Sequence, residues 1–258
     1  MSKVIYINNE NKIGLSTRRP TNGSEWALVQ DFTEYFTSLY RKSRKRSSSL
    51  AVFYEPSLET GFPDLVFAEY KPKVFDRWVD GRLNLQLSDI KVLQHIYHSN
   101  GVTSKDIEKQ IGMDTRTLLN TIERLLDAHV VKRDFGYWMA VDIDEIFGVE
   151  KLIAIEAKVK HNVTVFQQAQ LNRWFASESY ALFPVTKTTA KAVERSEEYG
   201  VGVYVFNTDK GFSELMPSPK QKLPSCYGSW LFNEWVGRSI SRNLECQGDG
   251  VIDNNITT

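Results

Sequence analysis

The chain has 258 residues, 41% of them hydrophobic, and its 32 Lys and Arg residues balance 32 Asp and Glu residues; that is enough apolar material for one core, or for a large and a small domain. No stretch approaches twenty apolar residues and the N-terminus lacks the apolar core of a leader, so neither a membrane span nor a signal peptide is expected. Two cysteines, Cys226 and Cys246, are too few for a disulfide scaffold or a cysteine-rich zinc site, which favours a reducing, cytoplasmic location.

The first eighty residues predict a strand, a helix and a pair of strands. KVIYI (3–7) has the composition of a short strand and leads into a polar loop. Apolar side chains then recur at helical spacing from Glu25 to Tyr40, and Ser24 precedes them as the expected N-cap. The runs LAVFYEP (50–56) and DLVFAEY (64–70) are rich in β-branched and aromatic residues, which predicts two strands joined by a turn near residues 60–61.

A basic run, RKSRKRSSS (41–49), lies between the helix and the strand pair. Such a run cannot be buried, so it predicts a solvated loop or a helix end. A solubilising surface loop has this composition, and so does a loop that contacts nucleic-acid phosphates, for which Arg44, Lys45 and Arg46 are the candidates.

Composition and period change over residues 86–140. LSDIKVLQHIYHSNG predicts a helix that ends at Asn-Gly, TSKDIEKQIGM a short helix capped by Thr103 or Ser104, and DTRTLLNTIERLLDAHVV a longer helix capped by Asp114. Two short strands around Phe135-Gly136 follow. Three helices and a hairpin at these spacings resemble a winged helix-turn-helix, which is a DNA-binding module.

The longer helix would be the recognition helix of this module. Its core side is expected to carry Leu118, Leu119, Ile122, Leu125 and Leu126. Its outer side keeps Arg116, Thr117, Asn120 and Arg124 available for DNA. Acidic residues match the basic ones across residues 86–140, so the salt-dependent attraction to DNA would be weak, and a winged helix can also bind protein or brace the fold.

Strands and helices alternate after residue 146. The expected strands cover residues 151–160, 181–185 and 201–207, and the expected helices cover 163–180, 188–200 and 229–244. This pattern predicts an α/β fold with a smaller inserted module. Residues 1–80 and 146–247 would form the main domain, residues 81–145 the insertion, and residues 248–258 a disordered tail.

The stretch GFPDLVFAEYKPK (61–73) looks like a complete nuclease signature of the PD-(D/E)xK type. Side chains on a strand alternate between its two faces, so Asp64 would face away from Glu69 and Lys71. The five residues from Asp64 to Glu69 leave no room for a turn and a second strand. Only a bulge could bring Asp64, Glu69 and Lys71 to one metal ion. Asp64 is therefore half of a candidate site, and Glu69-Tyr70-Lys71 is a coincidence.

A second candidate lies ninety residues later, in AIEAKVK (154–160), where Glu156 and Lys158 are two apart on a predicted strand and share a face. The run IEAKVKHNVTVFQQAQLNRWFASESYALFP resembles the PD-(D/E)xK, or restriction-endonuclease-like, superfamily, in which ExK on a strand is followed by a helix bearing Gln and then by another strand. With Asp64 as its partner, the resemblance covers residues 24–206 apart from the insertion. It implies a restriction-endonuclease-like mixed sheet flanked by helices, with an inserted winged-helix module.

The resemblance implies metal-dependent hydrolysis of DNA phosphodiester bonds. Asp64 and Glu156 would hold a hard divalent cation such as Mg²⁺, which prefers oxygen ligands. The cation would polarise the scissile phosphate and lower the pKa of an attacking water, while Lys158 would position that water and offset developing charge. Enzymes of this kind often cut as homodimers, and no residue of this chain bears on that expectation.

Two further site residues depend on the same resemblance. The superfamily often adds an acid from its first helix, and Glu25, in phase with the apolar side of that helix, is favoured over Glu34 on the polar side. A first-turn acid such as Glu25 also suits the helix dipole without any role in a site. Gln168 resembles the helix Gln that supports the site in some branches, with Gln167 and Gln170 as near-equal rivals.

Three functions compete for this chain. A metal-dependent DNA endonuclease, with the winged helix contributing to DNA binding, accounts for all of the motifs together. A catalytically inactive, nuclease-like DNA-binding regulator would use only the insertion, and an assembly protein would present aromatic residues such as Trp174, Trp230 and Trp235 at an interface. The four histidines have no metal-ligand spacing and the chain has no glycine-rich phosphate loop, so the endonuclease is the favoured interpretation.

Overall fold

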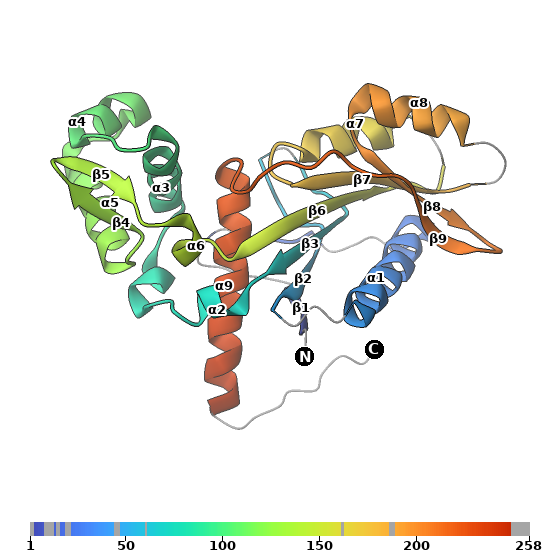
Figure 1. The fold of residues 1–258 in the computed structure, drawn as a ribbon, viewed down its shortest axis with the longest axis horizontal. Helices are drawn as coiled ribbons and strands as arrows, with labels where there is room; N and C mark the ends of the chain where they lie inside the picture. The colour runs from blue at the N-terminus through green and yellow to red at the C-terminus, as the bar shows by residue number, and fades with distance from the viewer. Residues whose placement is uncertain are drawn as a thin grey trace.

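The computed structural model describes the backbone of residues 3–7, 13, 16–18, 22–43, 47–59, 61–160, 163–185 and 189–248, and the side chains of these residues up to 241. The described residues form an α/β protein with a mixed seven-stranded sheet and a separate two-stranded hairpin (Figure 1). The sheet order is β1-β2-β3-β6-β7-β8-β9, with strands Val4–Ile7, Ser49–Tyr54, Leu65–Tyr70, Val149–Ala157, Glu178–Pro184, Gly202–Asn207 and Gly211–Met216. The hairpin consists of β4 (Val131–Asp134) and β5 (Tyr137–Ala140).

Both kinds of strand pairing occur in the sheet. The pairs β1–β2, β6–β7 and β7–β8 are parallel, whereas β2–β3, β3–β6 and β8–β9 are antiparallel. The α-helices are α1 (Ser24–Lys42), α2 (Pro72–Phe75), α3 (Leu87–Ser99), α4 (Ser104–Ile107), α5 (Thr115–Asp127), α6 (Ile143–Ile146), α7 (Val163–Asn172), α8 (Ala190–Tyr199) and α9 (Tyr227–Gly248). A 3₁₀-helix, η1 (Asp80–Asn84), and a π-helix, η2 (Glu108–Gly112), complete the set. Among the described helices, none combines the length and the apolar content needed to cross a bilayer.

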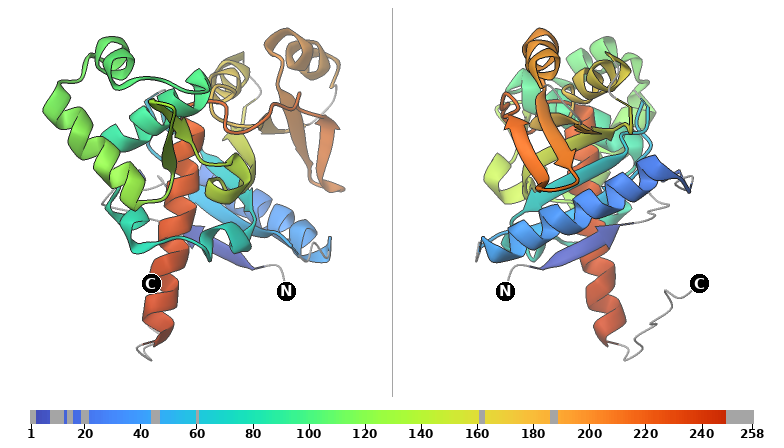
Figure 2. Two further views of the ribbon diagram at one scale, coloured as in Figure 1. Left: turned by 60° about the vertical axis from the view of Figure 1, so that its left-hand side comes forward. Right: turned by 90° about the vertical axis from the view of Figure 1, so that its right-hand side faces the viewer.

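Helices cover both faces of the sheet. On one face α1 packs through Leu28, Val29 and Phe32 against the odd-numbered residues of β3 and β6. On the other face α7 and α8 cover β7 and β8, and α9 packs beside the even-numbered residues of β3. The views in Figure 2 keep α7 and α8 on one side of the sheet and α1 on the other. All residues of β3 are buried, because each face of the strand is covered.

The segment between β3 and β6 carries α3, α4, α5 and the β4–β5 hairpin, and it lies beyond α9 from most of the sheet (Figure 1). Its caps follow from the sequence, because Thr103 accepts the backbone N–H of Asp106 at 3.3 Å and Asp114 accepts that of Thr117 at 3.0 Å. The hairpin turns at Phe135, whose φ of 44° lies in the left-handed region. We call residues 81–145 the insert.

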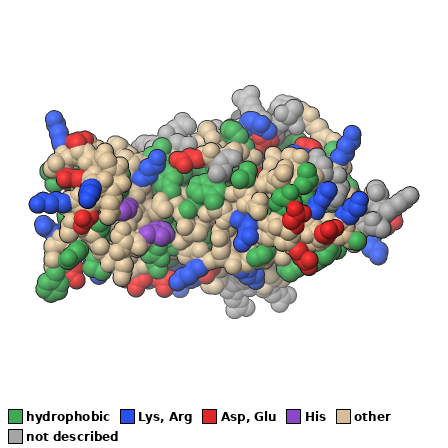
Figure 3. All heavy atoms as spheres, turned by 90° about the horizontal axis from the view of Figure 1, so that it is seen from above, with side chains coloured by type: hydrophobic (Ala, Val, Ile, Leu, Met, Phe, Trp, Pro, Cys, Tyr) green, Lys and Arg blue, Asp and Glu red, His purple; other side chains and the backbone are tan. Residues whose placement is uncertain are grey.

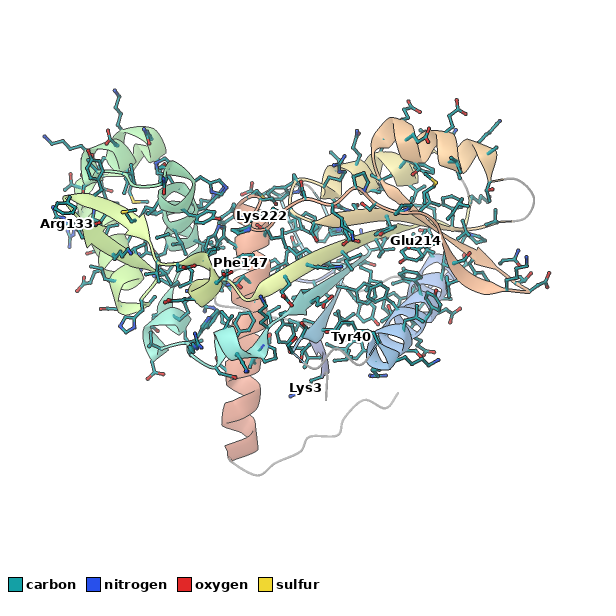
Figure 4. The ribbon with its side chains drawn as sticks, viewed as in Figure 1. Lys3, Tyr40, Arg133, Phe147, Glu214 and Lys222 are labelled. Atoms are coloured by element: carbon teal, nitrogen blue, oxygen red, sulfur yellow. The ribbon has the colours of Figure 1, made fainter. Side chains whose placement is uncertain are left out.

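Helix α9 joins the insert to the sheet. Trp230 of α9 is fully buried and contacts the ring of Tyr97 in the insert, and Phe147, labelled in Figure 4, lies against it where β6 begins. On the same helix, the buried Glu234 pairs with the buried Arg82 of η1 at 2.5 Å. The insert is therefore packed onto the sheet domain through both apolar and ionic contacts.

Several element predictions need correction. The helix expected over 163–180 ends at Asn172, since Phe175 and Ala176 join the core beside α9 and β7 already begins at Glu178. Strand β9 was not expected from the sequence. Ser24 is the first residue of α1, and Gly23 occupies the N-cap position without a side-chain cap. The predicted tail beyond Gly248 lies outside the described residues.

Candidate active site

Strands β3 and β6 bring Asp64 next to Glu156. Their antiparallel register pairs Leu65 with Ile155, so Asp64, one residue before β3, falls opposite Glu156 near the end of β6. The Asp64 Oδ2 atom accepts the backbone N–H of Ala157 at 2.7 Å, across 93 residues of sequence. Two acids that the sequence places far apart are therefore neighbours at one end of two adjacent central strands.

Burial and mutual repulsion shape the titration of this pair. Glu156 is 3% exposed, and burial, followed by the charge of Asp64, raises the pKa of Glu156 to about 8 despite a hydrogen bond from Asn172 and the charge of Lys158. Burial also raises the pKa of Asp64, with the N–H of Ala157 and the charge of Lys158 acting in the opposite direction. Two adjacent carboxylates of this kind share a proton at neutral pH unless a cation neutralises them.

Helix α7 holds Glu156 from the side. The Nδ2 atom of Asn172 donates to Oε1 of Glu156 at 2.7 Å, and Asn172 is 4% exposed. Sequence reasoning did not single out Asn172, although its position four residues after Gln168 puts both on one side of α7. Gln168 is half-buried, and among the described residues its Oε1 atom has no hydrogen-bond partner. Its rivals Gln167 and Gln170 are exposed.

Lys158 contacts the acid predicted from the first helix. Its Nζ atom lies 3.1 Å from Oε2 of Glu25, and the two side chains are 21% and 48% exposed. Burial lowers the pKa of Lys158, but the charge of Asp64 and the contact with Glu25 outweigh it, so the net pKa is raised and the ammonium persists at neutral pH. The rival acid Glu34 is exposed on α1 and does not line the cavity described next.

The expectation that Glu156 and Lys158 share a face is not met by their contacts. Glu156 meets Asn172 on the α7 side, whereas Lys158 meets Glu25 on the α1 side. Strand β6 ends at Ala157, and although the backbone N–H of Lys158 still donates to the carbonyl of Leu182 at 2.9 Å, its long side chain extends to Glu25 of α1. Each still influences the pKa of the other, so the two charges remain close.

A small cavity of about 180 Å³ opens beside this group. Its walls consist of Arg18, Glu25, Trp26, Val29, Glu55, Asp64 and Lys158. Glu156 is buried next to Asp64 rather than in the cavity wall. Arg18 and Glu55 were not predicted, yet the β2–β3 register pairs Tyr54 with Leu65 and therefore puts Glu55 opposite Asp64. An acid at the end of the predicted LAVFYEP strand was the available signal.

The donor set suits a cation held jointly by protein and solvent. Within the described ranges, no three His, Cys, Asp or Glu side chains are grouped closely enough to hold a metal ion by themselves. Asp64 and Glu156 offer two adjacent carboxylates whose repulsion a divalent cation would relieve. Mg²⁺ commonly binds through one or two carboxylates and completes its octahedron with water and phosphate oxygens, so these two residues fit it.

The shorter motif lies elsewhere. Glu69 pairs in register with Lys151, and both line a cavity of about 370 Å³ on the α1 side of the sheet. Lys71 makes an ion pair with Glu150 at 3.0 Å. Neither residue approaches Asp64, in keeping with the strand alternation.

The predicted DNA-contacting residues differ in how free they are. Arg116, Thr117 and Asn120 are exposed on α5, but the Thr117 hydroxyl donates to the cap Asp114 at 2.5 Å. Arg124 is not available as expected, because Nε and Nη2 both donate at 2.7 Å to Asp89, which is fully buried and needs a counter-charge. Arg44, Lys45 and Arg46 lie outside the described residues.

The surface of the insert also departs from expectation. Leu119 and Leu126, assigned to the core side of α5, are 62% and 40% exposed, since the buried residues of this helix are Leu118, Thr121, Ile122 and Leu125. Arg133 lies at the outer end of the insert, far from the sheet (Figure 4). Basic and acidic side chains are interspersed over the face seen in Figure 3, as the zero net charge suggests.

Comparison of the chain with models of known protein families, with curated protein sequences and with solved structures found no match. The function of the chain is therefore inferred from the geometry of the site.

Proposed function

We propose that this protein is a metal-dependent endonuclease of the restriction-endonuclease-like kind that hydrolyses DNA phosphodiester bonds. The observation that carries the proposal is the meeting of Asp64 with Glu156 and Lys158 beside one cavity. The sequence pattern alone predicts that the ExK pair and the distant Asp converge. If the two motifs resembled the superfamily only by chance, nothing would require Asp64 and Glu156 to lie side by side.

Each residue of the site would have its own role in the reaction. Asp64 and Glu156 would hold the cation, and Asn172 orients the Glu156 carboxylate through its hydrogen bond. Lys158, fixed by Glu25, would donate to the attacking water or to a phosphate oxygen and offset the charge that develops there. When bound, Mg²⁺ would supply Lewis-acid polarisation of the phosphate and a water of lowered pKa.

The insert would contribute DNA binding. Its three helices and hairpin have the order of a winged helix, and Arg116 and Asn120 are exposed on the helix that would enter the groove. The Arg116→Ala/Asn120→Ala double variant should weaken DNA binding, whereas Lys105→Ala, an exposed charge on α4, should not. Equal binding by the double variant and the wild type would remove α5 from the DNA interface.

Cleavage of supercoiled plasmid DNA in Mg²⁺ tests the proposal directly. Lys158→Ala should abolish nicking while the unfolding temperature stays close to that of the wild type. Lys71→Ala is the matched control, because Lys71 belongs to the discarded motif and pairs with Glu150 instead. Equal nicking by Lys158→Ala and the wild type would refute the assignment of the site.

A second candidate function is DNA binding without catalysis. It is favoured by one observation, the burial of Glu156 outside the cavity wall, which makes its ionisation costly. Binding of DNA with no cleavage in Mg²⁺ or Mn²⁺ would support this candidate over the endonuclease.

A further inference from the structure

Arg18 is built into the cavity wall by a short strand-like pairing. Its backbone N–H donates to the carbonyl of Glu55 at 3.1 Å, and one step along, the N–H of Ser57 donates to the carbonyl of Ser16 at 2.8 Å. The side chains of the same two residues are also hydrogen-bonded, because Nε of Arg18 donates to Oε2 of Glu55 at 2.6 Å. Backbone and side chain therefore fix Arg18 against the same residue.

Glu55, which holds Arg18, is buried and has an unusual backbone conformation. Its side chain is 9% exposed and its φ of 41° lies in the left-handed region, which is rare for a residue with a Cβ atom. Its backbone N–H donates to the carbonyl of Asp64 at 3.1 Å, so this bend is tied directly to the candidate metal-binding residue. Conformations of this kind persist where surrounding contacts enforce them, and they cluster at functional sites.

The guanidinium of Arg18 remains open to solvent while it is held. The Arg18 side chain is 60% exposed, and its Cζ atom lies 5.5 Å from the ring centroid of Phe62. Glu55 on one side and an aromatic ring on the other restrict the plane of the guanidinium. An arginine fixed in this way loses little conformational freedom when it binds a second oxyanion.

Charge balance indicates what that oxyanion could be. The cavity and its buried neighbour hold four carboxylates, those of Glu25, Glu55, Asp64 and Glu156. Lys158 already pairs with Glu25 and is 21% exposed, so Arg18 is the more solvent-accessible cation of the cavity wall. A divalent cation at the Asp64–Glu156 pair would cancel the excess negative charge, after which a phosphate group could approach Arg18.

We propose that Arg18 binds a backbone phosphate of the nucleic-acid substrate at the mouth of the cavity, and that Glu55 is the positioning residue that aims it. This inference rests on the proposed endonuclease function. Arginine presents two parallel N–H groups that match two phosphate oxygens, which lysine cannot reproduce. Fixing the phosphate at this point would hold the scissile bond beside Asp64 and Lys158.

The test compares Arg18→Ala, Arg18→Lys and Glu55→Gln with the wild type. Arg195→Ala is the matched control, because the Arg195 guanidinium also lies over a phenylalanine ring, 6.0 Å from the centroid of Phe166, but on α8. Binding of a short DNA duplex is measured by fluorescence anisotropy with Ca²⁺ in place of Mg²⁺, over a series of salt concentrations. Cleavage with Mg²⁺ gives KM and kcat separately, and thermal unfolding reports folding.

Arg18→Ala should weaken DNA binding and raise KM by about 10- to 100-fold, as expected for the loss of one charge-assisted hydrogen-bonded contact. The slope of log Kd against log salt should fall by about one, the value for one phosphate contact. Arg18→Lys should recover only part of the affinity, Glu55→Gln should raise KM, and Arg195→Ala should behave as the wild type. A purely structural ion pair would lower the unfolding temperature without changing the salt slope.

The outcomes separate the two proposals. If the wild type cuts DNA and Arg18→Ala matches it in KM and salt slope, the role of Arg18 is overturned while the endonuclease stands. If Arg18→Ala does not fold, full affinity and an unchanged KM in Arg18→Lys would overturn it equally, because lysine keeps the charge but not the paired N–H groups. If the wild type neither binds nor cuts DNA, the endonuclease and the role of Arg18 both fail.

Discussion

Replacing Glu156 with glutamine should make the protein more stable at alkaline pH while destroying its proposed activity. Glutamine has the shape of a protonated glutamate and keeps an oxygen to accept the hydrogen bond from Asn172. It removes the charge that burial and Asp64 oppose, and its amide can donate to the Asp64 carboxylate. The substitution therefore isolates the ionisation of Glu156 from its packing.

The sign and size follow from the pKa of Glu156. In the unfolded chain the carboxyl loses its proton near 4.5, whereas in the folded protein it does so at about 8. Between these values the folded state binds more protons, so the free energy of unfolding falls as pH rises, and above pH 8 the full penalty is present. A difference of about 3.5 pKa units corresponds to about 5 kcal/mol, an upper value because water and side chains adjust around a buried charge.

Guanidinium chloride unfolding at pH 4, 6 and 8.5, without divalent cations, measures this effect. At pH 4 the Glu156→Gln variant and the wild type should differ little, and at pH 8.5 the variant should be more stable by about 2 kcal/mol or more. Glu69→Gln is the control, since Glu69 is buried to a similar extent at the other end of β3 but outside the pair. A wild type whose stability relative to Glu156→Gln does not change between pH 4 and 8.5 would refute the reasoning.

Three further predictions concern the cation at the Asp64–Glu156 pair, the hydrogen bond from Asn172, and the separate ion pair between Arg82 and Glu234. Mg²⁺ or Ca²⁺ at pH 8 should raise the unfolding temperature of the wild type but not of Asp64→Asn or Glu156→Gln, and an equal rise in all three would place the cation elsewhere. Asn172→Ala should lower cleavage or metal affinity roughly 10- to 100-fold, the range for groups that orient a metal ligand, and unchanged steady-state kinetics would exclude that role. Glu234→Gln should destabilise the protein by about 3–5 kcal/mol in denaturant unfolding, because it leaves the buried Arg82 without its counter-charge, and a loss below about 1 kcal/mol would contradict this account.

The sequence was most informative where local pattern and tertiary contact agree. Strand alternation separated Asp64 from Glu69 correctly, because β3 pairs with β6 without a register shift from Leu65 to Glu69 and is covered on both faces. The same alternation failed for Lys158, which lies just past the end of β6. Local rules thus located the candidate acids but did not predict that the long Lys158 side chain ends beside Glu25 of α1.

Contacts between residues of different elements could not be predicted from such local patterns. Arg124 lies on the outer half of an amphipathic helix, and the sequence of that helix does not indicate that Arg124 pairs with the buried Asp89 of α3. Arg18 lies in a polar loop whose short pairing with Glu55 has no strand pattern. In each case the fold brings a buried carboxylate, Asp89 or Glu55, next to the arginine with which it pairs.

The position of the insert follows from the pairing that builds the site. β3 and β6 are adjacent and antiparallel, and the N–H of Lys71 donates to the carbonyl of Gly148 at 2.9 Å, so the insert replaces the turn of a hairpin. The site lies at the opposite end of the same two strands, which puts it about 20 Å from the root of the insert at ~3.3 Å per residue. On a duplex with about 3.4 Å per base pair this is roughly six base pairs. If the insert holds the DNA that the cavity cuts, cleavage should fall to one side of the protected sequence, and a footprint centred on the cleavage position would contradict that arrangement.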